Sequence, residues 1–141
     1  MSFLAFFVLC GLKNLTKYLL KFANSSIDVS DGLIDDLSKM INTQNLSFQL
    51  FEKKIPISNK LSNLIKNQKL NKINLVSKGD DYQVLFTANV NKTRIIQNAS
   101  KTTGIKITKI GKIVSGKDRS FIFDEKGKQI QAKSKGYIHQ F

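Results

Sequence analysis

The thirteen residues SSIDVSDGLIDDL, at positions 25–37, change from strand-like to helix-like spacing and decide what the surrounding chain forms. Up to residue 30 the side chains are typical of a short strand. From Gly32 onward, apolar side chains recur every three or four residues, as they do on one face of a helix. The stretch therefore predicts a strand over 25–30, a tight turn, and a helix with Leu33, Leu37, Met40 and Ile41 on one side.

The same stretch gathers acids in a basic chain. The formal net charge is +13, and only ten Asp and Glu occur among 141 residues. Four of the ten stand here, as Asp28, Asp31, Asp35 and Asp36. They begin where the strand gives way to the helix, so they are expected at a turn, where a ligand can reach them.

The rest of the chain alternates helices with strands. Apolar spacing predicts a helix from Leu12 to about Asn24, and the alternation of Leu46, Phe48 and Leu50 predicts a half-buried strand. Further elements are a helix over about 58–69, strand-like runs on both sides of 79–81, a helix over roughly 91–103, and strands in IKITKIGKIVSG and SFIFDEKGKQIQAK with a turn at 126–127. The predicted fold class is α/β (α+β), a single mixed-sheet sandwich with helices packed on it.

Composition limits the function. With 41% hydrophobic residues the chain can bury one core. Its 21 lysines are spread along the sequence beside only two arginines, and readers of nucleic acid favour arginine, so no nucleic-acid partner is expected. A small basic RNA- or anion-binding protein remains the alternative in a different functional class. The single cysteine, Cys10, excludes an internal disulfide and favours a cytoplasmic location.

The opening MSFLAFFVLCGL is apolar for about a dozen residues, fewer than the ~20 that span a bilayer, so no membrane partner is expected. Three interpretations are open for this segment: a buried strand, a misplaced start or a secretory signal. The signal fits poorly, because Lys13 follows the apolar run and a secretory signal has its basic residues before it. Residues 1–13 are thus an apolar segment of uncertain origin before a domain over 14–141. Its phenylalanines, Phe3, Phe6 and Phe7, are expected to lie on an exposed apolar surface that drives self-association, unless residues 1–12 fold back as an extra strand or helix and cover it.

Asp28 and Asp31 have the chemistry of a magnesium site. Mg²⁺ takes oxygen ligands and usually keeps one or two carboxylates together with substrate phosphates. Ser30 adds a hydroxyl, and Gly32 allows close approach of the backbone to an anion. The competing interpretation is structural: Asp31 caps the helix, while Asp35 and Asp36 are solvated or pair with Lys39.

A second acidic pair, Asp80 and Asp81, stands in SKGDDYQVLF between two strand-like runs. Adjacent carboxylates in a tight loop need a counter-charge, which a cation or a basic ligand would supply. Other chemistries lack their residues, since the sequence contains no P-loop, no G-x-G-x-x-G and only one histidine, His139. Any phosphoryl transfer here is therefore not of the P-loop kind.

Three stretches in order, ANSSIDVSDGLIDDL, SKGDDYQVLFT and GYIHQF, resemble the C-terminal half of thiamine-monophosphate kinases. In that family the pattern runs near ANAAIDISDGLLADL, GGDDYELLFT and GYDHF. The resemblance covers about residues 14–141 and implies the C-terminal domain of the aminoimidazole-ribonucleotide-synthetase-like fold. It implies an enzyme that transfers the γ-phosphoryl group of ATP to thiamine monophosphate, giving thiamine diphosphate, with Mg²⁺.

The resemblance also implies site residues. Asp28 and Asp31 would be magnesium ligands and Ser30 an ATP contact, while Asp80, Asp81 and Tyr137 would contact thiamine monophosphate. The sequence departs from the family pattern on the substrate side, where Lys78, Gln83 and Ile138 replace a glycine, a glutamate and an aspartate.

The resemblance leaves no room for the family's N-terminal nucleotide-binding domain. The partners expected are therefore ATP, thiamine monophosphate, and the missing N-terminal domain or a homodimer partner, and no catalytic residue is assigned to this chain alone. A related ATP-dependent enzyme, such as selenophosphate synthetase, is the alternative within the superfamily. The isolated chain is expected to be inactive.

Overall fold

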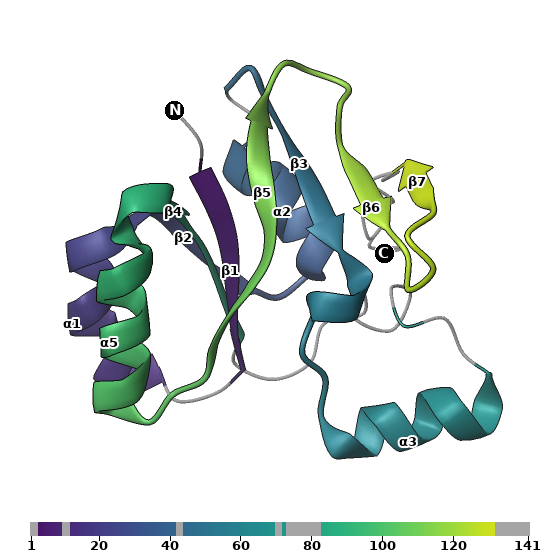
Figure 1. The fold of residues 1–141 in the computed structure, drawn as a ribbon, viewed down its shortest axis with the longest axis horizontal. Coiled ribbons are helices and arrows are strands. Elements are labelled where there is room, and N and C mark those ends of the chain that lie inside the picture. Colours follow the sequence, from purple (N-terminus) through teal and green to yellow (C-terminus); the bar gives the residue numbers. More distant parts are fainter. Residues whose placement is uncertain (1–2, 10–11, 42–43, 70–71, 73–82, 132–141) are drawn as a thin grey trace, which may run out of the picture.

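The computed structural model describes residues 3–9, 12–41, 44–69, 72 and 83–131 (Figure 1). The described strands form one sheet in the order β2-β4-β1-β5-β3-β6-β7. Neighbouring strands are antiparallel except for β3 and β6, which are parallel, so the sheet is mixed. The strands are β1 (Phe3–Leu9), β2 (Ala23–Val29), β3 (Leu46–Phe51), β4 (Gln83–Asn89), β5 (Ile107–Ser115), β6 (Phe121–Phe123) and β7 (Gln129–Gln131).

Helices connect and cover these strands. The described helices are α1 (Leu12–Phe22), α2 (Leu33–Ile41), α3 (Asn59–Gln68) and α5 (Thr93–Thr103), with 3₁₀ turns η1 (Glu52–Lys54) and η2 (Val90–Lys92). The predicted helix ending at Gly104 is confirmed: Gly104 adopts φ 69°, a left-handed conformation that suits glycine at a helix end. The predicted α+β fold class with a mixed sheet is confirmed. None of the helices in the described ranges is long and apolar enough to cross a membrane.

Two split β–α–β units build the sheet. In the first, α1 links β1 to β2 with β4 paired between them; in the second, α5 links β4 to β5 with β1 between them. The strands β1 and β4, from which the two crossovers start, are antiparallel, and the crossovers move across the sheet in opposite directions. Two crossovers of the same handedness therefore place both helices on the same face of the sheet. Figure 1 shows α1 and α5 side by side on that face and α2 on the other.

Each face of the sheet has its own core. Alternation along β4 sends Val84, Phe86 and Ala88 toward α1 and α5, where the Phe86 ring lies 5.3 Å from that of Phe22. Leu85 points the other way, into the core beneath α2. Burying one such side chain stabilises the fold by about 1.5–3 kcal/mol. The sheet is therefore held between two helical layers, as a sandwich requires.

The opening segment is a central strand. β1 pairs with β4 along one edge and with β5 along the other, so the backbone of Phe3–Leu9 is paired on both sides. Phe3 itself is half-buried and packs against the core under α2. Of the interpretations open from the sequence, a strand within the fold is the one found, and the expectation that Phe3 lies on an exposed, unpaired segment is wrong.

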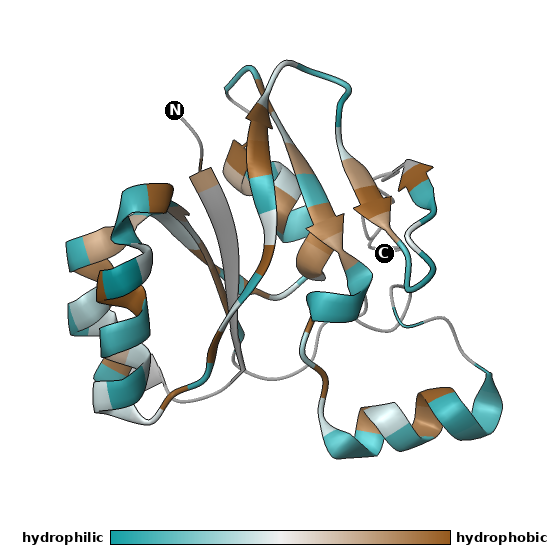
Figure 2. Cartoon of the chain, in the orientation of Figure 1, coloured by the Kyte–Doolittle hydropathy of each residue, from teal (hydrophilic) through white to brown (hydrophobic). Residues whose placement is uncertain are grey.

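Helix α3 forms as predicted but contributes no buried residue. Its first turn is capped by Ser58, whose side chain accepts the N–H of Leu61 at 3.2 Å. Leu64 stays 45% exposed. Figures 1 and 2 show α3 lying apart from the sheet with hydrophilic and hydrophobic residues interspersed along it, so the two cores do not depend on it.

Candidate metal and nucleotide site

The turn from β2 to α2 holds the acids that the sequence singled out. Ile27 and Val29 alternate toward the core beneath α2, which leaves Asp28 on the opposite side of this edge strand, exposed. Ser30 follows, also exposed. Gly32 then adopts φ 114°, a conformation that L side chains rarely take, and its carbonyl accepts the N–H of Asp36 at 3.0 Å to begin α2.

Asp36 organises this turn. Its side chain is only 1% exposed, and Oδ2 accepts the backbone N–H of Ser30 at 2.7 Å and that of Asp31 at 3.0 Å. Its other oxygen, Oδ1, accepts from Nζ of Lys39 at 3.2 Å. The predicted pairing of Asp36 with Lys39 is thus confirmed, whereas a solvated Asp36 is wrong, because one buried carboxylate ties the loop to the helix.

Lys39 bridges two carboxylates. Its ammonium contacts Asp31 as well as Asp36, and the Lys39 and Asp31 side chains remain 53% and 39% exposed. Hydrogen bonding to Asp31, and then to Asp36, raises the pKa of Lys39 above its ordinary 10.5. At neutral pH Lys39 is therefore fully charged and neutralises part of the acidic turn.

Asp28 lies near the end of β2, and Ser30 and Asp31 follow in the turn before α2, so their proposed shared role stays a prediction. Asp80, Asp81 and Tyr137, and with them the substrate-side departures Lys78 and Ile138, fall outside the described residues, so their roles stay predictions. The organising role of Asp36 was missed. Its position held the signal, because Asp36 lies three residues after Leu33 and next to Leu37, on the apolar face of the helix.

The donor types of Asp28, Ser30 and Asp31 are ones that magnesium takes. Two carboxylates and a hydroxyl are a typical protein contribution to a site that phosphates and water complete. Among the residues described, no group of three or more His, Cys, Asp or Glu is arranged to hold a metal ion. A site on this turn therefore needs oxygens from outside the described residues.

A cavity beside the start of β2 is a separate feature. It has a volume of about 220 Å³ and is lined by Asn24 and Ser25 from the start of β2, and by Met40 and Ile41 from the end of α2. Ser25 and Thr87 share a hydrogen bond of 2.8 Å at its wall. Asp28, Ser30 and Asp31 do not line it, so the acidic turn is not part of this cavity.

Comparison with known proteins shows which proteins this chain resembles in sequence and in fold. No family model matches the chain. The chain is 36% identical over 123 residues to the thiamine-monophosphate kinase of Buchnera aphidicola subsp. Acyrthosiphon pisum (strain APS), a match that covers 84% of this chain and 36% of that relative. The chain thus spans about a third of the length of the curated relatives it matches.

Solved structures agree. The hydrogenase maturation protein HypE of Escherichia coli has a TM-score of 0.72 at 11% identity, covering 93% of this chain and 49% of that chain, and shares the fold alone. AaThiL complexed with AMPPCP and TMP has a TM-score of 0.62 at 27% identity, covering 85% of this chain and 35% of that one. The fold is that of the aminoimidazole-ribonucleotide-synthetase-like proteins. Within that class, the chain is a homologue of thiamine-monophosphate kinases over most of its own length.

Proposed function

We propose that this chain is the C-terminal half of a thiamine-monophosphate kinase and takes part in phosphorylating thiamine monophosphate to thiamine diphosphate with ATP, in the cytoplasm. The observation that carries the proposal is the acidic turn, with Asp28, Ser30 and Asp31 at the start of α2, in a chain whose curated relatives are kinases of that name. The complex of AaThiL with AMPPCP and TMP supports the same substrate pair.

In this proposal Asp28 and Asp31 hold Mg²⁺ and Ser30 contacts ATP. When bound, the ion neutralises phosphate charge and orients the phosphates for in-line transfer. The bond from the γ-phosphorus to the ADP oxygen breaks, and a new one forms to a phosphate oxygen of thiamine monophosphate. Exposure of Asp28 and Ser30 leaves both side chains open to a nucleotide held by another domain.

The substrate side is also proposed by resemblance. Asp80 or Asp81 would lie near thiamine monophosphate, and Tyr137 would pack against its ring. In this proposal a second domain supplies the rest of the ATP site, which is consistent with a chain that covers 36% of its Buchnera relative.

The test is Asp28→Asn, made in this chain and assayed together with the part of the Buchnera kinase that the chain does not match. Turnover should be abolished while the fold is retained, because a neutral amide is a poor magnesium ligand. Asp118→Asn, an equally exposed aspartate remote in sequence, is the matched control and should leave turnover unchanged. Activity of Asp28→Asn within about tenfold of the unmodified chain, about 1.4 kcal/mol of barrier, would contradict the ligand role.

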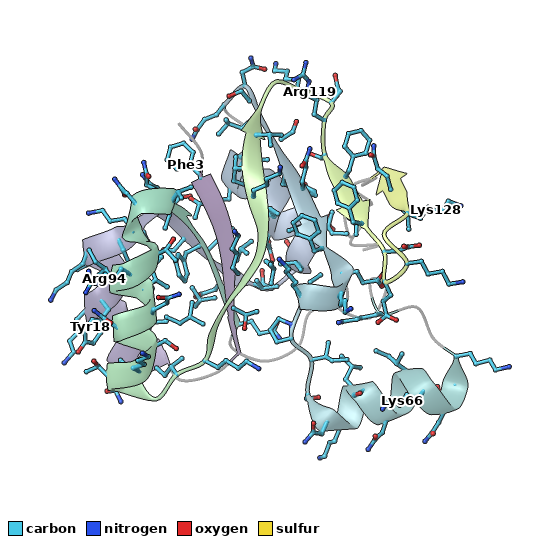
Figure 3. All side chains as sticks on the ribbon, in the orientation of Figure 1. Phe3, Tyr18, Lys66, Arg94, Arg119 and Lys128 are labelled. Carbon is cyan, nitrogen blue, oxygen red and sulfur yellow. The ribbon has the colours of Figure 1, made fainter. Side chains whose placement is uncertain are left out.

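One observation favours a second function, binding to the phosphate backbone of RNA. Residues 1–27 and 83–117 hold ten Lys and Arg and no Asp or Glu, and they supply β1, α1, β4, α5 and β5. Exposed cations from both helices, Lys17, Lys21, Arg94 and Lys101, gather on one layer, on which Figure 3 labels Tyr18 and Arg94. Lysines far apart in sequence are thereby concentrated on one face of the molecule.

A salt titration tests this second function. Binding of a labelled single-stranded RNA should weaken with salt, with a slope of about −0.7 per phosphate neutralised. Replacing Arg94 and Lys101 by glutamine should flatten the slope, whereas the same change at Lys60 and Lys66 on α3 should not. Negligible affinity at physiological salt would exclude RNA binding as a function of this face.

A further inference from the structure

Lys39 forms an ion pair with Asp31, whose carboxylate is one of the ligands of the proposed magnesium site. Its ammonium contacts Asp31, and it also contacts Asp36 at 3.2 Å. Lys39 is the only cation on α2, whose sequence is LIDDLSKMI. Among the described residues, the positive charge nearest Asp31 is thus the side chain of Lys39.

The position of Lys39 is fixed by the same group that shapes the turn. Asp36 is buried, and through Oδ2 it holds the backbone of Ser30 and Asp31 while Oδ1 holds Lys39. One carboxylate therefore sets both the loop that carries Asp31 and the amine that contacts it. An ordinary surface lysine on a helix does not contact two carboxylates in this way.

A metal ion and an ammonium group compete for one carboxylate. An ion bound to Asp31 would lie close to the positive charge of Lys39, and like charges repel at that range. If Lys39 leaves Asp31, it keeps an ion pair with Asp36. Exchange at Asp31 therefore requires loss of one contact of Lys39 and not of both.

We propose that Lys39 is a built-in counter-cation that competes with the divalent ion for Asp31. It offsets part of the negative charge of the half-site in the chain alone and sets a threshold that a second domain and nucleotide phosphates must overcome. This inference rests on the proposed function, since it assumes that Asp31 is a metal ligand. Its consequence is that Lys39 lowers the affinity of this chain for a free divalent cation.

Mn²⁺ added to the 141-residue chain is the probe, and paramagnetic broadening of the backbone NMR signals of Ser30 and Asp31 is the readout. Lys39→Gln should bind Mn²⁺ about tenfold more tightly at low salt, where charge interactions are least screened. Lys66→Gln removes the same charge from α3, where Figure 3 shows Lys66 away from the sheet, and should behave as the unmodified chain. Asp31→Asn should abolish the gain in Lys39→Gln.

Lys39→Arg provides a second variant that keeps the charge over Asp36. A guanidinium pairs with carboxylates through two parallel hydrogen bonds, so this variant should bind Mn²⁺ no more tightly than the unmodified chain. It keeps the inference testable if Lys39→Gln does not fold, which loss of NMR signal dispersion would reveal. Tighter binding by Lys39→Arg would overturn the inference.

Failures of the two proposals differ. If Lys39→Gln and Lys66→Gln bind Mn²⁺ equally, or if Lys39→Gln shows no broadening at Ser30 and Asp31, the competition by Lys39 is wrong. If Asp28→Asn and Asp31→Asn leave Mn²⁺ binding unchanged in every background, the magnesium role of the turn is wrong, and the proposed function loses its site. If those two variants weaken binding but Lys39→Gln does not strengthen it, the site stands and the inference falls.

Discussion

Asp36 joins the backbone of the acidic turn to helix α2. It is buried at 1% exposure, and its two oxygens accept from two backbone N–H groups and one ammonium. A buried carboxylate is tolerated when its lone pairs are used and a counter-charge is present. The side chains proposed to bind the ion, Asp28 and Asp31, therefore depend on a third aspartate that is itself withdrawn from solvent.

Asp36→Asn should destabilise the chain by about 1–3 kcal/mol, because an amide has one acceptor oxygen and leaves a buried partner unsatisfied. Urea denaturation followed by circular dichroism measures the change. Asp28→Asn, the same substitution at an exposed position, is the control and should stay within about 0.5 kcal/mol of the unmodified chain. Equal stability of the two variants would mean that Asp36 does not hold the turn.

At the scale of elements, β5 packs closely against β3 at Gly111. It lies between β1 and β3, and the register with β1 shifts so that Gly111 faces Ala5 while Lys109 faces Phe6. On its other side Gly111 faces Leu50 of β3. A Cβ at residue 111 would lie 2.3 Å from the carbonyl oxygen of Gln49, so only glycine fits between these backbones.

Gly111→Ala should therefore cost about 3 kcal/mol or more, since the clash is with backbone that moves only if the sheet distorts. Gly104→Ala is the comparison. It meets no atom within 4 Å but requires a left-handed φ of 69°, which costs about 1–2 kcal/mol. Thermal unfolding of both variants should place Gly111→Ala below Gly104→Ala, and the reverse order would show that β3 and β5 have room at this crossing.

At the scale of the whole molecule, the proposed function assigns to the chain one side of a phosphoryl-transfer site. The acidic turn is exposed, and the described residues contain no third carboxylate, cysteine or histidine placed to complete a metal site there. Transfer of a γ-phosphoryl group depends on positioning and on charge neutralisation from several directions. In the proposed function, the described part of the chain would supply these from one direction.

The 141 residues alone should thus give no thiamine diphosphate from ATP and thiamine monophosphate. Adding the part of the Buchnera kinase that this chain does not match should restore product, and leaving out Mg²⁺ should abolish it again. Chromatographic detection of thiamine diphosphate against a no-protein control is the measurement. Magnesium-dependent product from the chain alone would contradict the expectation.

The sequence alone determined the elements and the kinship. Spacing of Leu33, Leu37 and Ile41 predicted α2, and alternation of Phe48 and Leu50 predicted β3, because these periods reflect local backbone geometry. Three motifs in order identified the kinase family, which the comparisons bear out. The first strand-like run before residue 79 lies outside the described residues, so that prediction stays open.

Only the tertiary structure decided how distant segments meet. The opening segment had several interpretations until pairing with β4 and β5 on either side made it the central strand β1. The sequence did not show that Asp36 is buried and accepts the backbone N–H groups of Ser30 and Asp31; only the folded loop does. Lys17, Lys21, Arg94 and Lys101 came to lie in one layer because α1 and α5 pack on the same face of the sheet (Figure 1). Periodicity acts over a few residues, whereas burial and charge at a surface depend on which remote segments pack together.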